Sequence, residues 1–223
     1  MLAPRKKVSR KQLKEDPMMK TINKVTVFLQ NEWQKILSGA MVVLLIIFVA
    51  TWVQKSSLER EQNATTELYP YEDRYMNEVY DDQLIAGLNT IIERYKDTEA
   101  GNRAAFFLGN TYFNMGNYEQ AELQFNVFLN EHDGNDFMKC SALNGIAATY
   151  EQREMYNQAA EKYNDAVKSY PNTFLVPEAL LGAARSYEKL GQLEEAKARC
   201  ERILNDFPDT PQAEEAEVIK ARL

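Results

Sequence analysis

The fold is decided by residues 108–125, which read LGNTYFNMGNYEQAELQF. Leu108 and Tyr112 lie one helical turn apart before Gly116, and Ala121 and Phe125 repeat that spacing after it. This pattern predicts two helices joined by a short turn. Small residues are expected where the two helices cross closely, and aromatic residues where a neighbouring helix must be met.

The same pattern occurs twice more at a nearly constant spacing, which is called the repeat period. Tyr150 and Tyr187 are the residues equivalent to Tyr112 in the second and third copies. The second copy has Ile146, Ala147, Tyr150, Tyr156, Ala159, Tyr163, Ala166 and Pro171. The third copy has Ala183, Ala184, Tyr187, Gly191, Leu193, Ala196, Cys200 and Pro208. This order of residues resembles the tetratricopeptide repeat, a helix-turn-helix unit that stacks into a superhelix. The resemblance implies an all-α fold that binds proteins.

The repeats are expected at about residues 102–135, 140–173 and 177–210, within a domain of residues 72–223. Proline-containing connections such as Tyr170–Ala179 lengthen the usual period of about 34 residues. Residues 72–96 and 212–223 are expected to form capping helices. His132 and Gly134 are assigned to the loop that ends the first repeat.

Residues 36–53 form a continuous apolar segment without a charged side chain. As a helix it would span roughly 27 Å, close to the thickness of a bilayer core. Trp33 and Trp52 flank it, where interfacial aromatic rings prefer to lie. The segment therefore predicts a transmembrane helix, with a cleaved signal peptide and a buried core helix as the alternatives.

The flanks of this segment predict its surroundings. Residues 1–20 are expected to be a disordered basic tail, 21–35 an amphipathic juxtamembrane helix, and 54–71 a polar helical linker. Basic residues precede the segment and acidic residues follow it, so the N-terminus is expected to be cytoplasmic. In a Gram-negative bacterium the chain would be a single-pass inner-membrane protein whose C-terminal domain is periplasmic.

Composition excludes several classes of function. Residues after position 35 have 17 basic and 30 acidic side chains, a net charge of −13, which disfavours nucleic acid and anionic lipid as partners of the repeat domain. Cys140 and Cys200 have no metal-ligand spacing and are expected to be free buried thiols, with a disulfide between them as the alternative. We find no motif for catalysis, a metal or a cofactor, so an enzyme is not expected.

The repeat resemblance implies that a partner binds on the concave face, which the first helix of each repeat lines. The residues assigned to this face are Arg103, Phe106, Asn110, Phe113, Asn114, Asn144, Glu151, Gln152, Leu181, Arg185, Glu188 and Lys189, together with Ala148 and Glu178. Two exposed phenylalanines beside asparagines would suit an extended peptide. Alternatively, Phe106 and Phe113 pack against residues 72–96. The Lys and Arg of chaperone carboxylate clamps are absent, so that specificity is not expected.

The layout of the whole chain, from a short basic tail through one membrane helix to C-terminal repeats, resembles YfgM-type ancillary subunits of the bacterial Sec translocon. That resemblance implies a role in translocation of secreted proteins or in handover to periplasmic chaperones. The partners would be translocon subunits, emerging polypeptides or chaperones. The alternatives are a scaffold for envelope or outer-membrane assembly, whose known members are lipoproteins or soluble proteins, and self-assembly through the repeats.

Overall fold

The structure, a computed structural model, describes residues 17–130 and 135–223, and the regular structure in these residues is helical. The helices are α2 (Pro17–Met76), α3 (Asp82–Tyr95), α4 (Glu99–Asn114), α5 (Tyr118–Asn130), α6 (Asp136–Gln152), α7 (Tyr156–Ser169), α8 (Val176–Lys189), α9 (Leu193–Asp206) and α10 (Pro211–Arg222). The all-α prediction is therefore confirmed. The chain divides into two compact units, Met1–Leu58 and Glu59–Leu223, with the boundary inside α2.

The first unit contains a candidate membrane span in α2. An 18-residue window of this helix has a mean hydropathy of 2.6, and none of it is buried against protein. This exposure contradicts the alternative of a buried core helix. Residues 17–20, expected to be disordered, form the first turn of α2, whereas residues 1–16 of the predicted tail lie outside the described residues.

The second unit begins earlier than the predicted boundary at residue 72. Ala64 and Leu68 on α2 are fully buried, in one cluster with Leu84 and Leu88 of α3. The Glu61 carboxylate accepts hydrogen bonds from the first backbone N–H groups of α4 at 2.8 and 3.0 Å. The end of α2 and α3 therefore form a helix pair ahead of the first predicted repeat.

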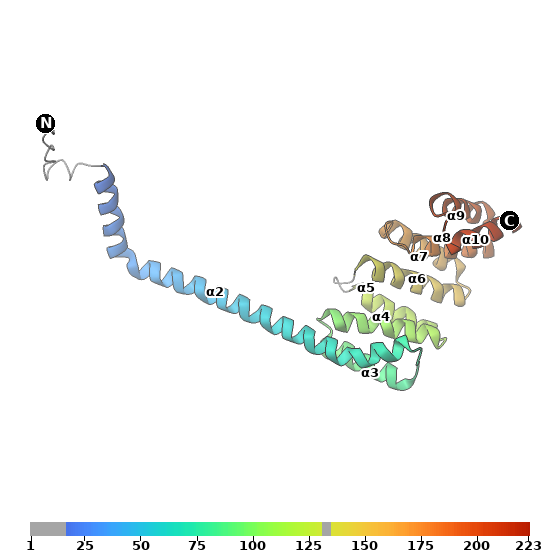
Figure 1. The fold of residues 1–223 in the computed structure, drawn as a ribbon, viewed down its shortest axis with the longest axis horizontal. Coiled ribbons are helices and arrows are strands. Elements are labelled where there is room, and N and C mark those ends of the chain that lie inside the picture. Colours follow the sequence, from blue (N-terminus) through green and yellow to red (C-terminus); the bar gives the residue numbers. More distant parts are fainter. Residues whose placement is uncertain (1–16, 131–134) are drawn as a thin grey trace, which may run out of the picture. The chain divides into compact units, whose positions relative to one another are not determined.

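The helices of residues 99–222 stack in sequential pairs (Figure 1). The first helices contact one another, α4 with α6, α6 with α8, and α8 with α10. No comparable contact joins α5 with α7 or α7 with α9 in the described part of the chain. The first helices thus line the closer, inner side of the stack, as the repeat resemblance implied.

Each pair turns through a residue in the left-handed backbone region. These residues are Gly116 (φ 78°), Glu154 (φ 60°) and Gly191 (φ 70°), at equivalent positions. After each one, the next N–H donates to the tyrosine carbonyl five residues earlier, from Asn117 at 2.8 Å, Met155 at 2.8 Å and Gln192 at 2.9 Å. The turn geometry is therefore common to all three repeats, although the second lacks glycine.

Glu154→Gly is expected to raise the free energy of unfolding by about 0.5–1 kcal/mol. A left-handed residue with a side chain costs about 1–2 kcal/mol, which the greater freedom of glycine in the unfolded chain partly offsets. The near-UV circular dichroism of the tyrosines would follow unfolding, because all 12 lie between residues 69 and 187. Gly191→Ala should shift stability in the opposite direction, and a destabilising Glu154→Gly would contradict the account.

The core places one aromatic ring beside a glycine at successive junctions. A Cβ on Gly145 would lie 2.6 Å from the Phe125 ring, and a Cβ on Gly182 would lie 2.3 Å from the Tyr163 ring. Glycine therefore lets α6 and α8 approach the rings of the preceding second helices. Cys140 and Cys200 are free and buried in this core, and burial raises the pKa of both thiols.

Candidate protein-binding groove

The predicted binding residues all lie on the first helices of the three repeats. Arg103, Phe106, Asn110, Phe113 and Asn114 belong to α4, Asn144, Glu151 and Gln152 to α6, and Leu181, Arg185, Glu188 and Lys189 to α8. The starts of two of these helices are fixed by side-chain caps. Thr98 Oγ1 accepts from the Gly101 N–H at 3.0 Å, and Asn135 Oδ1 accepts from the Met138 N–H at 2.8 Å.

A cavity of about 190 Å³ lies between α4 and α6 and extends to α7 and α8. The structure brings five of the assigned residues together here: Asn110, Phe113, Asn144, Ala148 and Glu178. The other lining residues are Phe125, Ser141, Gly145, Tyr163 and Leu175. The cavity therefore combines aromatic walls with amide, hydroxyl and carboxylate groups.

Asn144 is the buried polar residue of this cavity wall. The residue is 9% exposed, and within residues 17–130 and 135–223 neither Oδ1 nor Nδ2 has a hydrogen-bond partner. A buried amide that lacks partners costs about 1–3 kcal/mol. An amide retained under that penalty is suited to bonding a ligand in the adjoining cavity.

Asn144→Ala is expected to raise the free energy of unfolding of the unliganded protein by about 1 kcal/mol. The substitution removes the unpartnered amide and introduces a better helix former. Thermal unfolding of full-length protein in detergent would measure the change. Asn126→Ala on α5 is the control for an asparagine whose amide has a partner, because Asn126 Nδ2 donates to Glu122 O. A destabilised Asn144→Ala would show that the amide is structural.

A second cavity of about 270 Å³ lies between α8 and α10. Its lining residues are Glu178, Leu181, Arg185, Pro211, Gln212 and Glu215. Leu181 is buried, whereas Glu178 is exposed and belongs to both cavities. The two cavities therefore follow one another along the first helices, with Glu178 in common.

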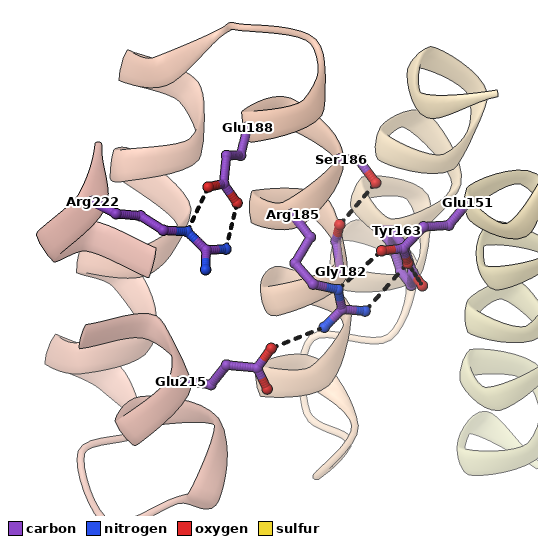
Figure 2. Close-up of polar contacts among 8 residues, drawn as sticks. All are labelled: Glu151, Tyr163, Gly182, Arg185, Ser186, Glu188, Glu215 and Arg222. Atoms are coloured by element: carbon purple, nitrogen blue, oxygen red, sulfur yellow. Dashed lines mark hydrogen bonds and ion pairs between the residues drawn. The ribbon is translucent and has the colours of Figure 1, made fainter. Parts of the chain in front are cut away.

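Arg185, which lines the second cavity, forms a network of ion pairs with neighbouring helices (Figure 2). Its Nε and Nη2 donate to the Glu151 carboxylate at 3.0 and 3.2 Å, and its Nη1 lies 3.6 Å from Glu215. The Tyr163 hydroxyl donates to Glu151 at 2.9 Å. Burial, followed by the charge of Glu151, raises the pKa of Tyr163. Burial opposes ionisation of Arg185, yet the Glu151 contacts raise its pKa overall.

Two other predicted residues also form inter-helix ion pairs. Glu188 accepts from Arg222 at 2.6 and 2.7 Å (Figure 2). Arg103 lies 2.5 Å from Glu72. These side chains join neighbouring helices, so their first role is in the stacking of the repeats. Asn114, Gln152 and Lys189 are not buried and line neither of the two cavities.

The prediction of two exposed phenylalanines is wrong. Phe106 and Phe113 are both partly buried. The Phe106 ring packs against Phe107, Phe125 and Phe128, with centroids 5.9, 6.1 and 5.4 Å away, and it is absent from the cavity lining. Phe113 contacts Tyr118 at 5.6 Å and remains a cavity residue. Only one of the two rings is therefore available to a ligand in this cavity.

Tyr150 belongs to a polar cluster at the junction of α5 and α6. Its hydroxyl donates to Glu122 at 2.6 Å, and Arg153 donates to the same carboxylate at 2.7 Å. Burial, and then the hydrogen bond to Glu122, raise the pKa of Tyr150 to about 12.

This raised pKa predicts a loss of stability at alkaline pH. An unfolded tyrosine releases its proton near pH 10, so the stabilisation is complete below pH 10 and is lost as the pH rises toward 12. Unfolding of wild type and Tyr150→Phe across this range would measure the contribution. Identical pH profiles would contradict the assigned hydrogen bond.

The cavity residues that were missed were missed for different reasons. Tyr163 was assigned to the core alone, but its hydroxyl reaches the groove network. Ser141 and Gly145 lie one repeat period after Arg103 and Phe107, so periodicity could have placed them on α6 beside the predicted residues. Leu175 belongs to an inter-repeat connection, for which the pattern gave no orientation.

Comparison with known proteins agrees with this geometry. Two sequence models of the tetratricopeptide repeat match, one over residues 151–218 and the other over residues 103–126. The search of curated proteins found no match. The repeat assignment is therefore supported by sequence models for parts of all three copies.

Solved structures with the same fold include a tetratricopeptide repeat protein from Parabacteroides merdae, with a TM-score of 0.59 and 17% identity. The match covers 71% of this chain and 59% of that one, so this chain spans less than two thirds of its length. Two structures of a chain described as a putative kinesin light chain with nearly identical repeats, from Podosopora anserina, have TM-scores of 0.58 and 0.57 and identities of 13% and 14%. Those matches cover 73% of this chain and 85% of theirs. At these identities the likeness shows the fold alone.

Proposed function

We propose that this protein is a membrane-anchored, protein-binding scaffold outside the cytoplasm that assists translocation of secreted proteins or chaperone handover beside the Sec translocon. Repeats of this type suggest a scaffold for protein–protein interactions. The observation that carries the proposal is the cavity between α4 and α6 with the unpartnered amide of Asn144. Backbone amides of an extended polypeptide have the donors and acceptors that this amide lacks.

Membrane attachment is supported by the wholly uncovered apolar window of α2. The double substitution Val43→Arg and Ile46→Arg should move the protein from a carbonate-resistant membrane pellet to the soluble fraction, since each central arginine opposes insertion by about 3 kcal/mol. Leu45→Val serves as the apolar control. Extraction of the wild type by carbonate would contradict the anchor.

Orientation is supported by the basic residues before the span and the acidic residues after it. Alkaline phosphatase, which folds actively only outside the cytoplasm, would be fused after Leu223. Activity is expected with the full chain and not with a chain that lacks residues 36–53. An inactive full-length fusion that is stably expressed would place the repeats in the cytoplasm and overturn the orientation.

The translocon role rests on the layout of the chain, and copurification tests it. Full-length protein, isolated from its native membrane in mild detergent, should carry translocon subunits, secreted polypeptides or periplasmic chaperones. Recovery should fall for Phe113→Ala and persist for Leu123→Ala, whose side chain is exposed on α5. Recovery of envelope-assembly machinery without the translocon would favour the structural scaffold instead.

A further inference from the structure

Positions one repeat period apart occupy equivalent places in successive repeats. The polar contacts between successive first helices, α4 with α6, α6 with α8 and α8 with α10, can therefore be compared. Each such contact is called a junction, and the face that these helices line is called the groove. Two ion pairs define one set of equivalent contacts: Glu151 with Arg185 at 3.0 Å, and Glu188 with Arg222 at 2.6 Å. At the preceding junction, the equivalent positions hold Phe113 and Ala148. This junction therefore lacks the ion pair that closes the later ones.

A second set of contacts is interrupted at the same place. It contains Glu72 with Arg103 at 2.5 Å near the start of the stack, and Arg185 with Glu215 at 3.6 Å near its end. Two equivalent pairs of positions lie between these contacts along the stack. One pair is occupied by Asn110 and Ser141, and the other by Ala148 and Glu178. Glu178 thus has alanine where the equivalent carboxylate, Glu215, has arginine. Within residues 17–130 and 135–223, no cation pairs with Glu178.

The interruption coincides with the 190 Å³ cavity. Phe113 and Ala148 from the first set and Asn110, Ser141 and Glu178 from the second all line it. The hollow therefore exists because small or uncharged side chains replace the long ion-paired ones. It lies beside the buried amide of Asn144, which has no hydrogen-bond partner among the residues that the structure describes.

The volume and the charge of this cavity determine which ligand it can bind. Small-molecule pockets usually exceed about 300 Å³, so a cavity of this size is suited to a single side chain. The aromatic rings of Phe113, Phe125 and Tyr163 favour an apolar one. Glu178 is exposed beside them with an unbalanced charge, and residues 59–223 carry 16 basic against 30 acidic side chains, a net charge of −14. The Glu178 carboxylate and the net negative charge of residues 59–223 both favour a ligand with a cationic side chain.

We propose that the groove selects extended peptide segments in which an apolar side chain and a lysine or arginine lie within two residues of each other. The apolar side chain fills the cavity, the peptide backbone bonds the Asn144 amide, and the cation pairs with Glu178 in place of the absent arginine. This specificity rests on the proposed protein-binding function and assigns its partner class.

The test is selection of a random ten-residue peptide display library on the full-length protein in detergent. Wild type should enrich sequences with an apolar residue within two residues of a basic one. For one enriched peptide, Glu178→Lys should weaken binding about ten-fold and Glu178→Gln less, since one cation–carboxylate contact is lost and, with lysine, becomes repulsive. Glu161→Lys, an equal charge change at an exposed site on α7, should leave the affinity unchanged.

Two further variants separate this specificity from the groove itself. Asn144→Ala should reduce binding of every enriched peptide by about ten-fold while raising the melting temperature. Ala148→Trp, which fills the cavity, should abolish enrichment. Enrichment that persists in Glu178→Lys with the same basic residues would overturn the charge specificity but leave the peptide groove intact. Wild-type enrichment no greater than that of Ala148→Trp would overturn both proposals.

Discussion

Phe125→Ala is expected to lower the free energy of unfolding of the repeat domain by about 3–5 kcal/mol, the largest effect of any substitution proposed for this chain. The ring is 1% exposed. It lies close enough to two helices that a Cβ on Gly109 or on Gly145 would approach it to 2.8 or 2.6 Å. One side chain therefore fills the junction between α4, α5 and α6, and its loss leaves a void that rigid helices cannot close.

Tyrosine near-UV circular dichroism of full-length protein in detergent would measure this loss, because both tryptophans lie at residues 33 and 52, outside the repeat domain. Phe125→Leu should retain much of the stability. Leu123→Ala, at a side chain that is 53% exposed, should change it by less than about 0.5 kcal/mol. Equal effects at positions 123 and 125 would contradict the assigned packing.

Arg185→Met is expected to lower the free energy of unfolding by about 2 kcal/mol, because it leaves the half-buried Glu151 without its cation. The side chain of Glu151 is 20% exposed and that of Arg185 is 34% exposed, so solvent screens the pair only in part. Tyr163 would remain as a donor to Glu151, which keeps the loss below that of a fully buried ion pair.

Arg222→Met is the matched control, because Arg222 forms the equivalent pair with Glu188 but is 54% exposed. It should lower stability much less than Arg185→Met does, because solvent screens the exposed pair. A double-mutant cycle of Arg185→Met with Glu151→Gln would isolate the pair, and a coupling energy near zero would remove it from the account.

The repeat period predicted most of the helical stack. Gly116 and Gly191 marked two of the turns between helices. The third turn was less evident, because Glu154 adopts the left-handed conformation without being glycine. The helix pair of residues 59–95 was only partly foreseen, since its α2 portion buries only Ala64 and Leu68.

The binding face was predicted to the correct helices but not to the correct side chains. Helical periodicity alone does not separate Phe106, which faces the aromatic core, from Asn110 and Phe113 one and two turns later, which face the cavity. Ion pairs between residues 31 to 34 positions apart depend on how the repeats stack, which the sequence does not state. The sequence also could not predict that the amide of Asn144 has no partner, because that depends on which side chains surround it in the fold.

Site-specific photocrosslinking would test the central claim, that the groove between α4 and α6 binds another polypeptide, most directly. A diazirine-bearing side chain would be placed at Ser141, which lines the cavity, or at Leu123, which is exposed on α5, in the full-length protein in its native membrane. If the groove binds a polypeptide, an adduct is expected from position 141 and not from position 123. Equal adducts from both positions, or none from position 141, would contradict this claim.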